Sequence, residues 1–230
     1  MTTLTMIQKM ATGLGRTFAI FFLTLAFSLP LGVILALLRR SKVGVLRGIT
    51  RTLISILRGT PLMLQLLAVT YGPYYISKFL ESQFGLALGI GVARNKLVPI
   101  IAGFAINYAA YFAEIYRGGI QSVPAGQEEA GLVLGMTKTQ IFFKVKLMQM
   151  IKRIVPPMSN EIITLVKDTS LARIIALQEI IWAGQAFMKG SQGIAGEIWP
   201  LFFTAVYYLI FNGVLTVLLE RLERKLDYFR

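Results

Sequence analysis

Long apolar runs alternate with short basic segments along this chain. Five of the runs reach the length of about 20 residues that an α-helix needs to cross a bilayer, although charged residues interrupt the second and the fourth. Backbone polar groups in lipid have to be hydrogen-bonded within their own segment, so such runs predict helices. The pattern predicts one all-α transmembrane domain over residues 1–230, with five spanning helices near 17–38, 53–76, 97–116, 154–181 and 199–219.

The positive charges are divided unevenly between the two sides of these helices. Sixteen lysines and arginines lie in segments 39–58 and 117–153 and after residue 220, and six lie in the alternate segments. The remaining two of the 24, Lys167 and Arg173, lie inside the fourth run. Cytoplasmic loops carry the excess of positive charge in membrane proteins. We therefore expect the N-terminus on the outer side, and the long loop 117–153 and the C-terminus in the cytoplasm.

The composition agrees with a lipid environment and narrows the chemistry. Hydrophobic residues make up 55% of the chain and charged residues 15%, against about 25% charged in a soluble domain. The lack of cysteine and histidine excludes disulfide scaffolds, zinc fingers and cysteine enzymes, and removes the commonest general base and metal ligand. The formal net charge of +13 implies no nucleic-acid partner, because the cations follow the positive-inside pattern.

The N-terminal run also has an alternative interpretation as a secretory signal peptide, because Lys9 and Arg16 precede it. The apolar part of a signal peptide is about 7–15 residues long. The 22 uncharged residues from Thr17 to Leu38 exceed that length and favour a retained membrane helix.

The cytoplasmic loop 117–153 is predicted to form two short helices joined at a glycine. Pro124 is tolerated in a first helical turn, and Gly135 can take the left-handed conformation that ends a helix. Thr137 and Gln140 have the spacing of a capping box, directly before an apolar run. An alternative is that Gly131 and Gly135 form a helix-packing motif and that the loop is only a connector.

The segment Glu129–Gly131, with Gly135, Val145 and Leu147 after it, resembles the EAA loop of bacterial ABC importer permeases. In that family the loop couples the permease to a cleft on the ATPase subunit. Gly131 stands where the family usually has alanine, and Met148 where it usually has proline. The resemblance implies that the coupling loop of this chain comprises Gln121, Pro124, Ala125, Gly126, Gln127, Glu128, Glu129, Ala130, Gly131, Gly135, Met136 and Thr137.

Three further segments, Arg58–Leu62, Ala113–Gln121 and Lys167–Leu171, resemble the polar amino acid permeases of the histidine, glutamine, arginine and cystine type. The four segments occur in matching order over nearly the whole chain. The resemblance implies the ABC importer type I permease fold and a multi-pass location in the bacterial cytoplasmic membrane. It also implies a transport subunit that is not itself an enzyme.

A hinge or kink is expected in the second run, at Arg58, Gly59, Thr60 and Pro61. Pro61 removes a helical hydrogen bond, and Gly59 allows close approach. Arg58 is as consistent with an ordinary boundary anchor, because its long side chain can reach the membrane surface.

Polar residues in the third and fourth runs are candidates for the substrate pathway, because ionisable groups at membrane depth normally face a bundle interior or a water-filled cavity. Helical spacing predicts that Glu161, Thr164, Asp168 and Glu179 share one face. An alternative is that these charges only pair across helices. An acidic stripe favours a cationic substrate, whereas Lys167 and Arg173 could bind a carboxylate, so the substrate charge stays open. The candidates are Asn107, Glu114, Asn160, Glu161, Thr164, Lys167, Asp168, Thr169 and Ser170.

Three function classes remain. The chain has no G-x-x-x-x-G-K-[ST] phosphate loop. If it is an ATP-driven permease, it is expected to bind no cofactor itself, and ATP and Mg are expected to bind to an ATPase partner. An ion-coupled secondary transporter or channel would show inverted repeats, and none is visible. An intramembrane enzyme would have to act through Ser, Lys or Asp alone. The expected partners of the permease are an ATPase dimer, a second permease subunit of the same or a related chain, an extracytoplasmic solute-binding protein, an amino acid substrate and membrane lipid.

Overall fold

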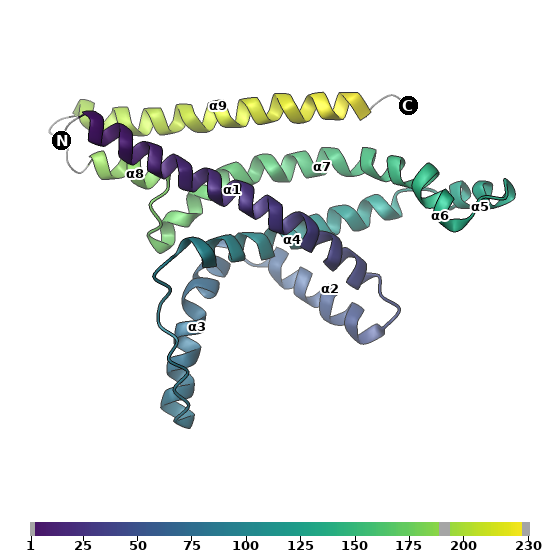
Figure 1. The fold of residues 1–230 in the computed structure, drawn as a ribbon, viewed down its shortest axis with the longest axis horizontal. Coiled ribbons are helices and arrows are strands. Elements are labelled where there is room, and N and C mark those ends of the chain that lie inside the picture. Colours follow the sequence, from purple (N-terminus) through teal and green to yellow (C-terminus); the bar gives the residue numbers. More distant parts are fainter. Residues whose placement is uncertain (1–2, 189–193, 227–230) are drawn as a thin grey trace.

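A computed structural model describes residues 3–188 and 194–226, and within this part every regular element is a helix (Figure 1). An all-α protein was predicted, and this is confirmed for the described chain. The elements are α1 (Thr3–Arg39), α2 (Gly44–Gly59), α3 (Leu62–Phe84), α4 (Leu97–Gln121), α5 (Ala125–Val133), α6 (Lys138–Ile141), the π-helical η1 (Phe142–Lys146), α7 (Leu147–Asp168), the 3-10 helix η2 (Thr169–Ile175), α8 (Ile180–Met188) and α9 (Ile194–Leu226).

The core lies where α1 packs along α4, with α3, α7 and η2 around them. Phe21 of α1 and Phe104, Tyr108 and Phe112 of α4 are at most 2% exposed. Gly32 brings the two helices into close contact, because a Cβ atom built on it would lie 2.8 Å from the Cβ of Phe112. The pair α1 and α4 is therefore the scaffold on which the other helices are arranged.

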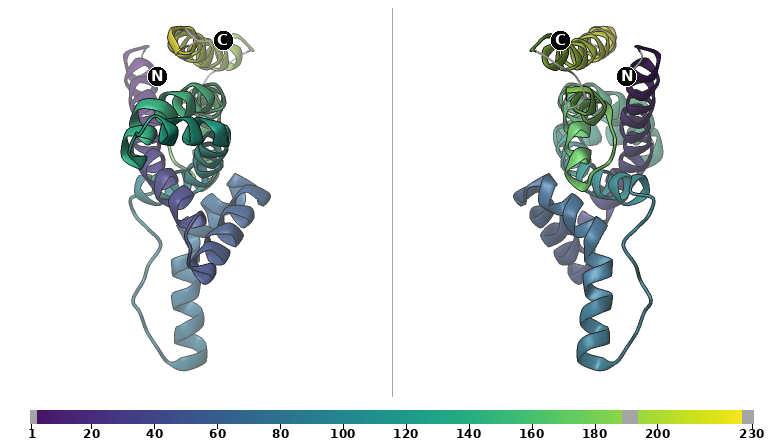
Figure 2. Two further views of the ribbon diagram at one scale, coloured as in Figure 1. Left: turned by 90° about the vertical axis from the view of Figure 1, so that its right-hand side faces the viewer. Right: turned by 90° about the vertical axis from the view of Figure 1, so that its left-hand side faces the viewer.

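Helix α3 leaves this scaffold and extends away from the other helices, and the irregular segment 85–96 returns alongside it (Figure 2). Gly85, which ends α3, has a φ of 67°, and its N–H binds the carbonyl oxygens of the last helical turn. A left-handed φ of this kind favours glycine at a helix end. The segment 77–96, between the second and third predicted spans, is thus partly helical, up to Phe84.

Within the described residues, three helical segments are long and apolar enough to cross a membrane: Gln8–Arg39, Leu97–Gln121 and Leu201–Leu226. The pair α2 and α3 would count as a fourth span if it crosses as one bent unit. α7 is 22 residues long, but its charged residues Lys152, Arg153, Glu161, Lys167 and Asp168 make it too polar to count as a span. The structure supports three or four spans, so the predicted fifth span and the orientation of the termini remain predictions.

The second predicted run is not one helix. α2 ends at Gly59, α3 begins at Leu62, and the two helices are bent by 111°. Pro61 has no N–H to donate to the carbonyl of Leu57, so the helical ladder stops there. The break lies where a kink was expected, and the two helices together are long and apolar enough to count as one bent span.

The fourth predicted run also ends early. α7 ends at Asp168 and continues as the 3-10 helix η2, after which Ala176 takes the left-handed conformation with a φ of 57°. Glu179 follows this turn and is fully buried. Its carboxylate accepts hydrogen bonds from the N–H groups of Ile181 at 2.8 Å and Trp182 at 2.7 Å. The prediction that Glu179 shares a face with Glu161, Thr164 and Asp168 is therefore wrong, because the turn breaks the helical period.

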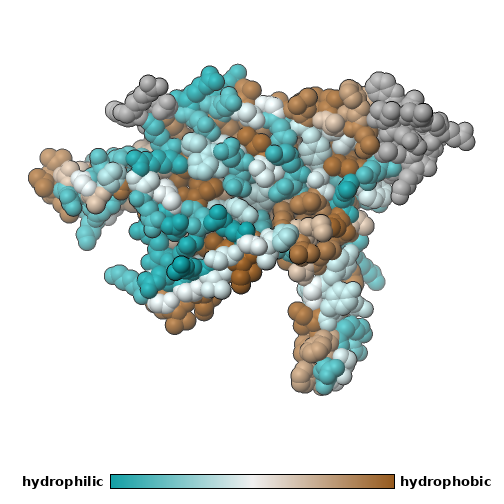
Figure 3. Space-filling model, turned by 180° about the vertical axis from the view of Figure 1, so that it is seen from behind, coloured by the Kyte–Doolittle hydropathy of each residue, from teal (hydrophilic) through white to brown (hydrophobic). Residues whose placement is uncertain are grey.

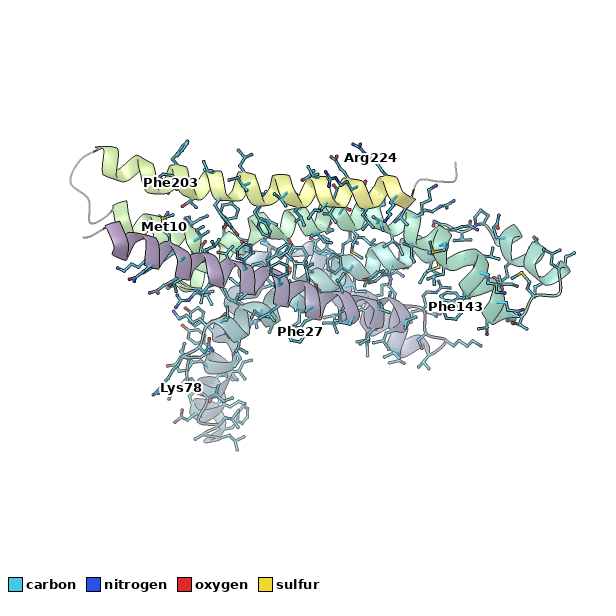
Figure 4. All side chains as sticks on the ribbon, turned by 45° about the horizontal axis from the view of Figure 1, so that its top comes forward. Met10, Phe27, Lys78, Phe143, Phe203 and Arg224 are labelled. Atoms are coloured by element: carbon cyan, nitrogen blue, oxygen red, sulfur yellow. The ribbon has the colours of Figure 1, made fainter. Side chains whose placement is uncertain are left out.

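Large apolar side chains reach the surface over much of the molecule (Figure 3). Phe27 points outward from α1 and Phe203 from α9, and they are 57% and 48% exposed (Figure 4). Such a surface would aggregate in water and is typical of a protein whose solvent is lipid.

We expect Gly32→Ala to lower the free energy of unfolding by about 1–3 kcal/mol, because the added methyl group cannot fit against the Cβ of Phe112. Gly15→Ala, in the same helix, is the control, because nothing lies within 4 Å of a Cβ built there. Thermal unfolding in detergent measures both. Equal melting temperatures would show that α1 and α4 are not in this close contact.

Candidate functional site

Glu114, near the end of α4, is surrounded by arginines from three helices. Its carboxylate forms ion pairs with Arg39 of α1 and with Arg117 at 2.8 Å, and Arg58 of α2 lies 3.9 Å away. The Glu114 side chain is only 12% exposed. A single carboxylate therefore holds α1, α2 and α4 together at this end of the molecule, and its pairing with Arg117 in its own helix is part of this larger cluster.

A cavity of about 430 Å³ opens beside this cluster. α2, α4 and α7 each contribute charged side chains to it, namely Arg58, Glu114, Arg117, Arg153 and Glu161. The guanidinium of Arg58 also lies over the ring of Tyr111, 5.2 Å from its centroid, which is a cation–π contact. Of the predicted pathway residues, Glu114 and Glu161 are thus brought together, with Arg58 from the predicted hinge.

The break between α2 and α3 is closed by side-chain hydrogen bonds. The carbonyl of Leu57, which would have accepted from Pro61 in a helix, accepts from the amide nitrogen of Gln65 at 2.7 Å and from that of Asn107 at 3.4 Å. Gln65 also donates to the hydroxyl and the carbonyl of Thr60, and accepts from Asn107 at 3.0 Å. Asn107 therefore forms hydrogen bonds with Leu57 and Gln65 at the break between α2 and α3, and it does not line the cavity.

A second polar cluster lies at the end of α7. The hydroxyl of Tyr108 donates to the carboxylate of Asp168 at 2.7 Å. Thr169 is fully buried, and its hydroxyl donates to the carbonyl of Val166 and lies 3.5 Å from the hydroxyl of Tyr208. These contacts join α4, α7 and α9 where α7 changes into η2.

The other predicted pathway residues are dispersed. Asn160 and Lys167 are exposed, and Thr164 and Ser170 are half-buried. The hydroxyl of Thr164 donates to the carbonyl of Asn160 in its own helix. The nine candidates do not form one site in this chain: two line the cavity, two join the cluster around Tyr108, and Asn107 supports the break.

The predicted helix–turn–helix of the cytoplasmic loop is confirmed as a local structure. Gly135 has a φ of 72° and follows α5, and the Thr137–Gln140 capping box begins α6. Gly131 is buried against Ile141, whose Cγ1 would lie 2.7 Å from a Cβ on that glycine. Glycine at this position therefore allows Ile141 to pack against α5.

Polar contacts attach this hairpin to the start of α7. Glu128 forms an ion pair with Lys146, and the hydrogen bond from this lysine, together with its charge, holds the pKa of the Glu128 carboxyl below its ordinary value. Gln127 accepts a hydrogen bond from Gln149 at 3.3 Å. At the base of the loop, Arg153 donates to the carbonyl of Ser122.

The tip of the hairpin is apolar and exposed. Leu132, Val133 and Leu134 are 49%, 87% and 78% exposed. Glu129 and Ala130 are exposed beside them. Phe143 projects from the same end of the molecule and is 60% exposed (Figure 4). An exposed apolar tip beside an exposed carboxylate has the properties of a docking surface.

The chain matches the family described as "binding-protein-dependent transport system inner membrane component" over residues 28–228. The chain belongs to this family. It is a permease, a transport component of the bacterial cytoplasmic membrane that crosses it more than once. The sequence-based assignment to the membrane and to ABC transport is confirmed.

Curated relatives of this permease span nearly its whole length. The L-cystine transport system permease protein of Bacillus subtilis (strain 168) is 34% identical over 218 residues, covering 94% of this chain and 86% of the relative. The glutamine transport system permease protein of Escherichia coli (strain K12) is 31% identical over 221 residues, covering 96% and 94%.

Two solved structures share the fold. The crystal structure of an amino acid ABC transporter with histidines has a TM-score of 0.79 at 28% identity, covering 98% of this chain and 99% of that one. An inward-facing MetNI methionine ABC transporter has a TM-score of 0.64 at 20% identity, which shows the fold alone. The ABC permease fold expected from the sequence is confirmed.

Several residues of these clusters were not foreseen from the sequence, notably Arg39, Gln65, Tyr108 and Lys146. Gln65 stands four positions after Pro61, which is a usable signal, because a polar side chain in the turn after a proline can replace the missing N–H. The others contact residues far along the chain, and no local spacing indicates such contacts.

We expect Gln65→Leu to destabilise the permease by about 1–3 kcal/mol, because the carbonyl of Leu57 and the side chain of Asn107 lose a buried partner. Asn160→Leu removes an exposed amide from α7 and should leave stability nearly unchanged. Thermal unfolding in detergent compares the two variants. A loss no larger than that of Asn160→Leu would show that Gln65 does not support the break.

Glu114→Gln should destabilise the permease by about 3–5 kcal/mol, because arginines from three helices lose the one carboxylate that balances them. Glu81→Gln is the matched control, since it breaks the exposed ion pair with Lys78 and should not change the melting temperature. Chemical unfolding monitored by tryptophan fluorescence checks both. Equal midpoints for Glu114→Gln and wild type would contradict the role of the cluster.

Proposed function

We propose that this permease is the membrane subunit of an ATP-driven importer for a polar amino acid, with five spans, the N-terminus outside and the C-terminus in the cytoplasm. The relatives are named as transport permeases for cystine and glutamine, and a structural neighbour is titled an amino acid ABC transporter. The observation that carries the coupling part of the proposal is the α5–α6 hairpin with its exposed tip.

The contacts of the α5–α6 hairpin would couple its movement to that of α7. Its internal contacts, the capping box and the packing of Gly131 on Ile141, fix its shape without a partner. The ion pair between Glu128 and Lys146 then joins it to η1, which continues directly into α7. A force on the exposed tip would therefore reach α7 as the movement of a connected body.

In this proposal the tip residues Leu132, Val133 and Leu134 enter an apolar cleft of an ATPase subunit, and Glu129 meets a cation at its rim. ATP and Mg bind to that ATPase, and the permease binds no cofactor. ATP would favour the state in which two coupling loops approach each other, and hydrolysis would release it.

A second permease subunit is expected to complete the passage. Only 6% of the apolar window in α9 is buried within this chain, and α3 extends away from the other helices (Figure 2). A homodimer and a heterodimer with a related chain fit equally well. An extracytoplasmic solute-binding protein would deliver the substrate to the outer side.

The cavity beside Glu114 and Glu161 is the best candidate for part of the substrate pathway. It offers guanidinium groups to a carboxylate and the carboxylate of Glu161 to a cationic group, which is the pattern of charges on an amino acid. The sequence left the substrate charge open, and the cavity accommodates the charges that all amino acids share.

We expect ATP-dependent uptake in liposomes that hold the permease with its ATPase and solute-binding partners. Labelled arginine, glutamine, glutamate and cystine, with ATP inside, identify the preferred substrate. Glu129→Lys should lower uptake by more than about tenfold, because reversing a charge in a docking interface costs several kcal/mol. The variant should still fold, since the Glu129 side chain is exposed.

Glu81→Lys, an equal charge reversal on the exposed side of α3, is the control and should transport normally. Uptake that needs an ion gradient but no nucleotide, and that is indifferent to Glu129, would overturn the proposal in favour of a secondary transporter.

A further inference from the structure

The first turns of α1 extend beyond the part of the helix that a bilayer can enclose. α1 has 37 residues and rises about 55 Å, whereas a hydrocarbon core is about 30 Å thick. The uncharged run 17–38 is long enough to cross this core by itself. This inference rests on the proposed function, in which the N-terminus is outside. The turns before Thr17 then stand in water on the outer side of the membrane.

Polar side chains recur on one side of this extension. Gln8, Thr12 and Arg16 are four residues apart, so they lie above one another along the helix. α8 packs beside the same turns of α1 (Figure 1). Gly13 allows this contact, because a Cβ atom built on it would lie 3.0 Å from the carbonyl oxygen of Glu179. The polar side of α1 therefore borders the contact with α8.

A cavity of about 330 Å³ lies at this contact. Lys9 and Arg16 line it from α1, Gln178 lines it from the turn before α8, and Trp182 lines it from α8. None of the described residues that line it is acidic. The neighbouring carboxylate of Glu179 is fully buried and accepts hydrogen bonds from N–H groups of α8. The cavity is therefore positively charged, and it has the size of a small-ligand site.

Two of the hydrogen-bond donors of this cavity are held in position by the fold. The Nη1 of Arg16 donates to the side-chain oxygen of Gln178 at 3.0 Å and to its carbonyl oxygen at 3.2 Å. Because the side-chain oxygen of Gln178 faces Arg16, the NH2 group of the same amide can donate to an anion. A guanidinium and a carboxamide fixed side by side match the two oxygens of a carboxylate.

The general charge pattern of the chain does not account for the cations of this cavity. The pattern predicts an excess of positive charge on the cytoplasmic side, and only six lysines and arginines lie in the segments expected outside. Lys9 and Arg16 are two of these six, and both line the cavity. Two cations gathered on the side that has few of them indicate a ligand of opposite charge.

We propose that this cavity is an outer binding site for a free amino acid. The carboxylate of the ligand binds Arg16, Lys9 and Gln178. Its ammonium group lies against the indole ring of Trp182. The site recognises the two groups that all amino acids share, so it discriminates little among their side chains. It is separate from the cavity beside Glu114, which lies at the opposite end of α1.

Trp182 itself can report binding. The chain has two tryptophans, and Trp199→Phe leaves Trp182 as the only one. This full-length chain is reconstituted in nanodiscs of phosphatidylcholine, without ATP, ATPase or solute-binding protein. Its fluorescence is titrated with arginine, with glutamine and with agmatine, which is arginine without its carboxylate. Because ATP and partners are left out, the result does not depend on how transport is driven.

We expect a saturable change in fluorescence with arginine and with glutamine. Agmatine should bind at least about tenfold more weakly than arginine, because it cannot accept the charge-assisted hydrogen bonds. Arg16→Gln should weaken the binding of arginine by at least about tenfold, and Arg16→Lys should restore part of it. Lys9→Gln leaves the hydrogen bonds between Arg16 and Gln178 in place and should also weaken binding. Arg94→Gln is the control, because it removes an equal charge from an exposed residue that does not line the cavity.

No fluorescence change with either amino acid, or equal affinities for arginine and agmatine, would overturn the site. A response that phosphatidylglycerol in the nanodisc abolishes would identify a lipid headgroup as the occupant. A response to the solute-binding protein alone would identify a docking contact, and both of these outcomes would also overturn the proposal. Failure of ATP-dependent uptake, with binding at Trp182 intact, would overturn the proposed function and leave this site standing.

Discussion

Every interruption of a buried helix leaves backbone groups without their helical partners, and the rest of this structure depends on how those groups are bonded. Two interruptions occur in the described chain, at Thr60–Pro61 and after η2. At the first, Gln65 and Asn107 donate to the carbonyl of Leu57. Gln65 lies directly after the break, whereas Asn107 comes from α4, so the second of these bonds forms only when α2 and α4 are packed together.

The second interruption is closed by side chains in the same way. After the turn at Ala176, the carboxylate of Glu179 accepts from the first N–H groups of α8, and the hydroxyl of Thr17 accepts from Ile180 at 3.3 Å. A buried carboxylate at a helix N-terminus satisfies orphan donors and the helix dipole together. Glu179 is thus a structural residue, although its position in an apolar run suggested a pathway.

In the proposed function, the clusters around Glu114 and the α5–α6 hairpin connect this architecture to transport. Glu114 joins α1, α2 and α4. The α5–α6 hairpin is joined to η1 by Glu128 and Lys146, and Arg153 of α7 reaches the carbonyl of Ser122. Movement of the hairpin would therefore shift the helices α4 and α7 that line the cavity. This cavity also lies beside α2, whose end at the break is supported by Gln65. The helices that form the cavity are the same ones that these contacts bind together.

The sequence by itself determined the features that depend on local spacing. Apolar length identified the spans in α1, α4 and α9, and glycine and capping chemistry located Gly135 and the Thr137–Gln140 box, because these signals act within a few residues. The resemblance of four short segments gave the family. Tertiary structure decided where helices stop and what their polar residues contact. The pairing of Arg39 and Arg58 with Glu114 and the separation of Asn107 from Glu161 depend on partners 40 or more residues away, which no local pattern encodes.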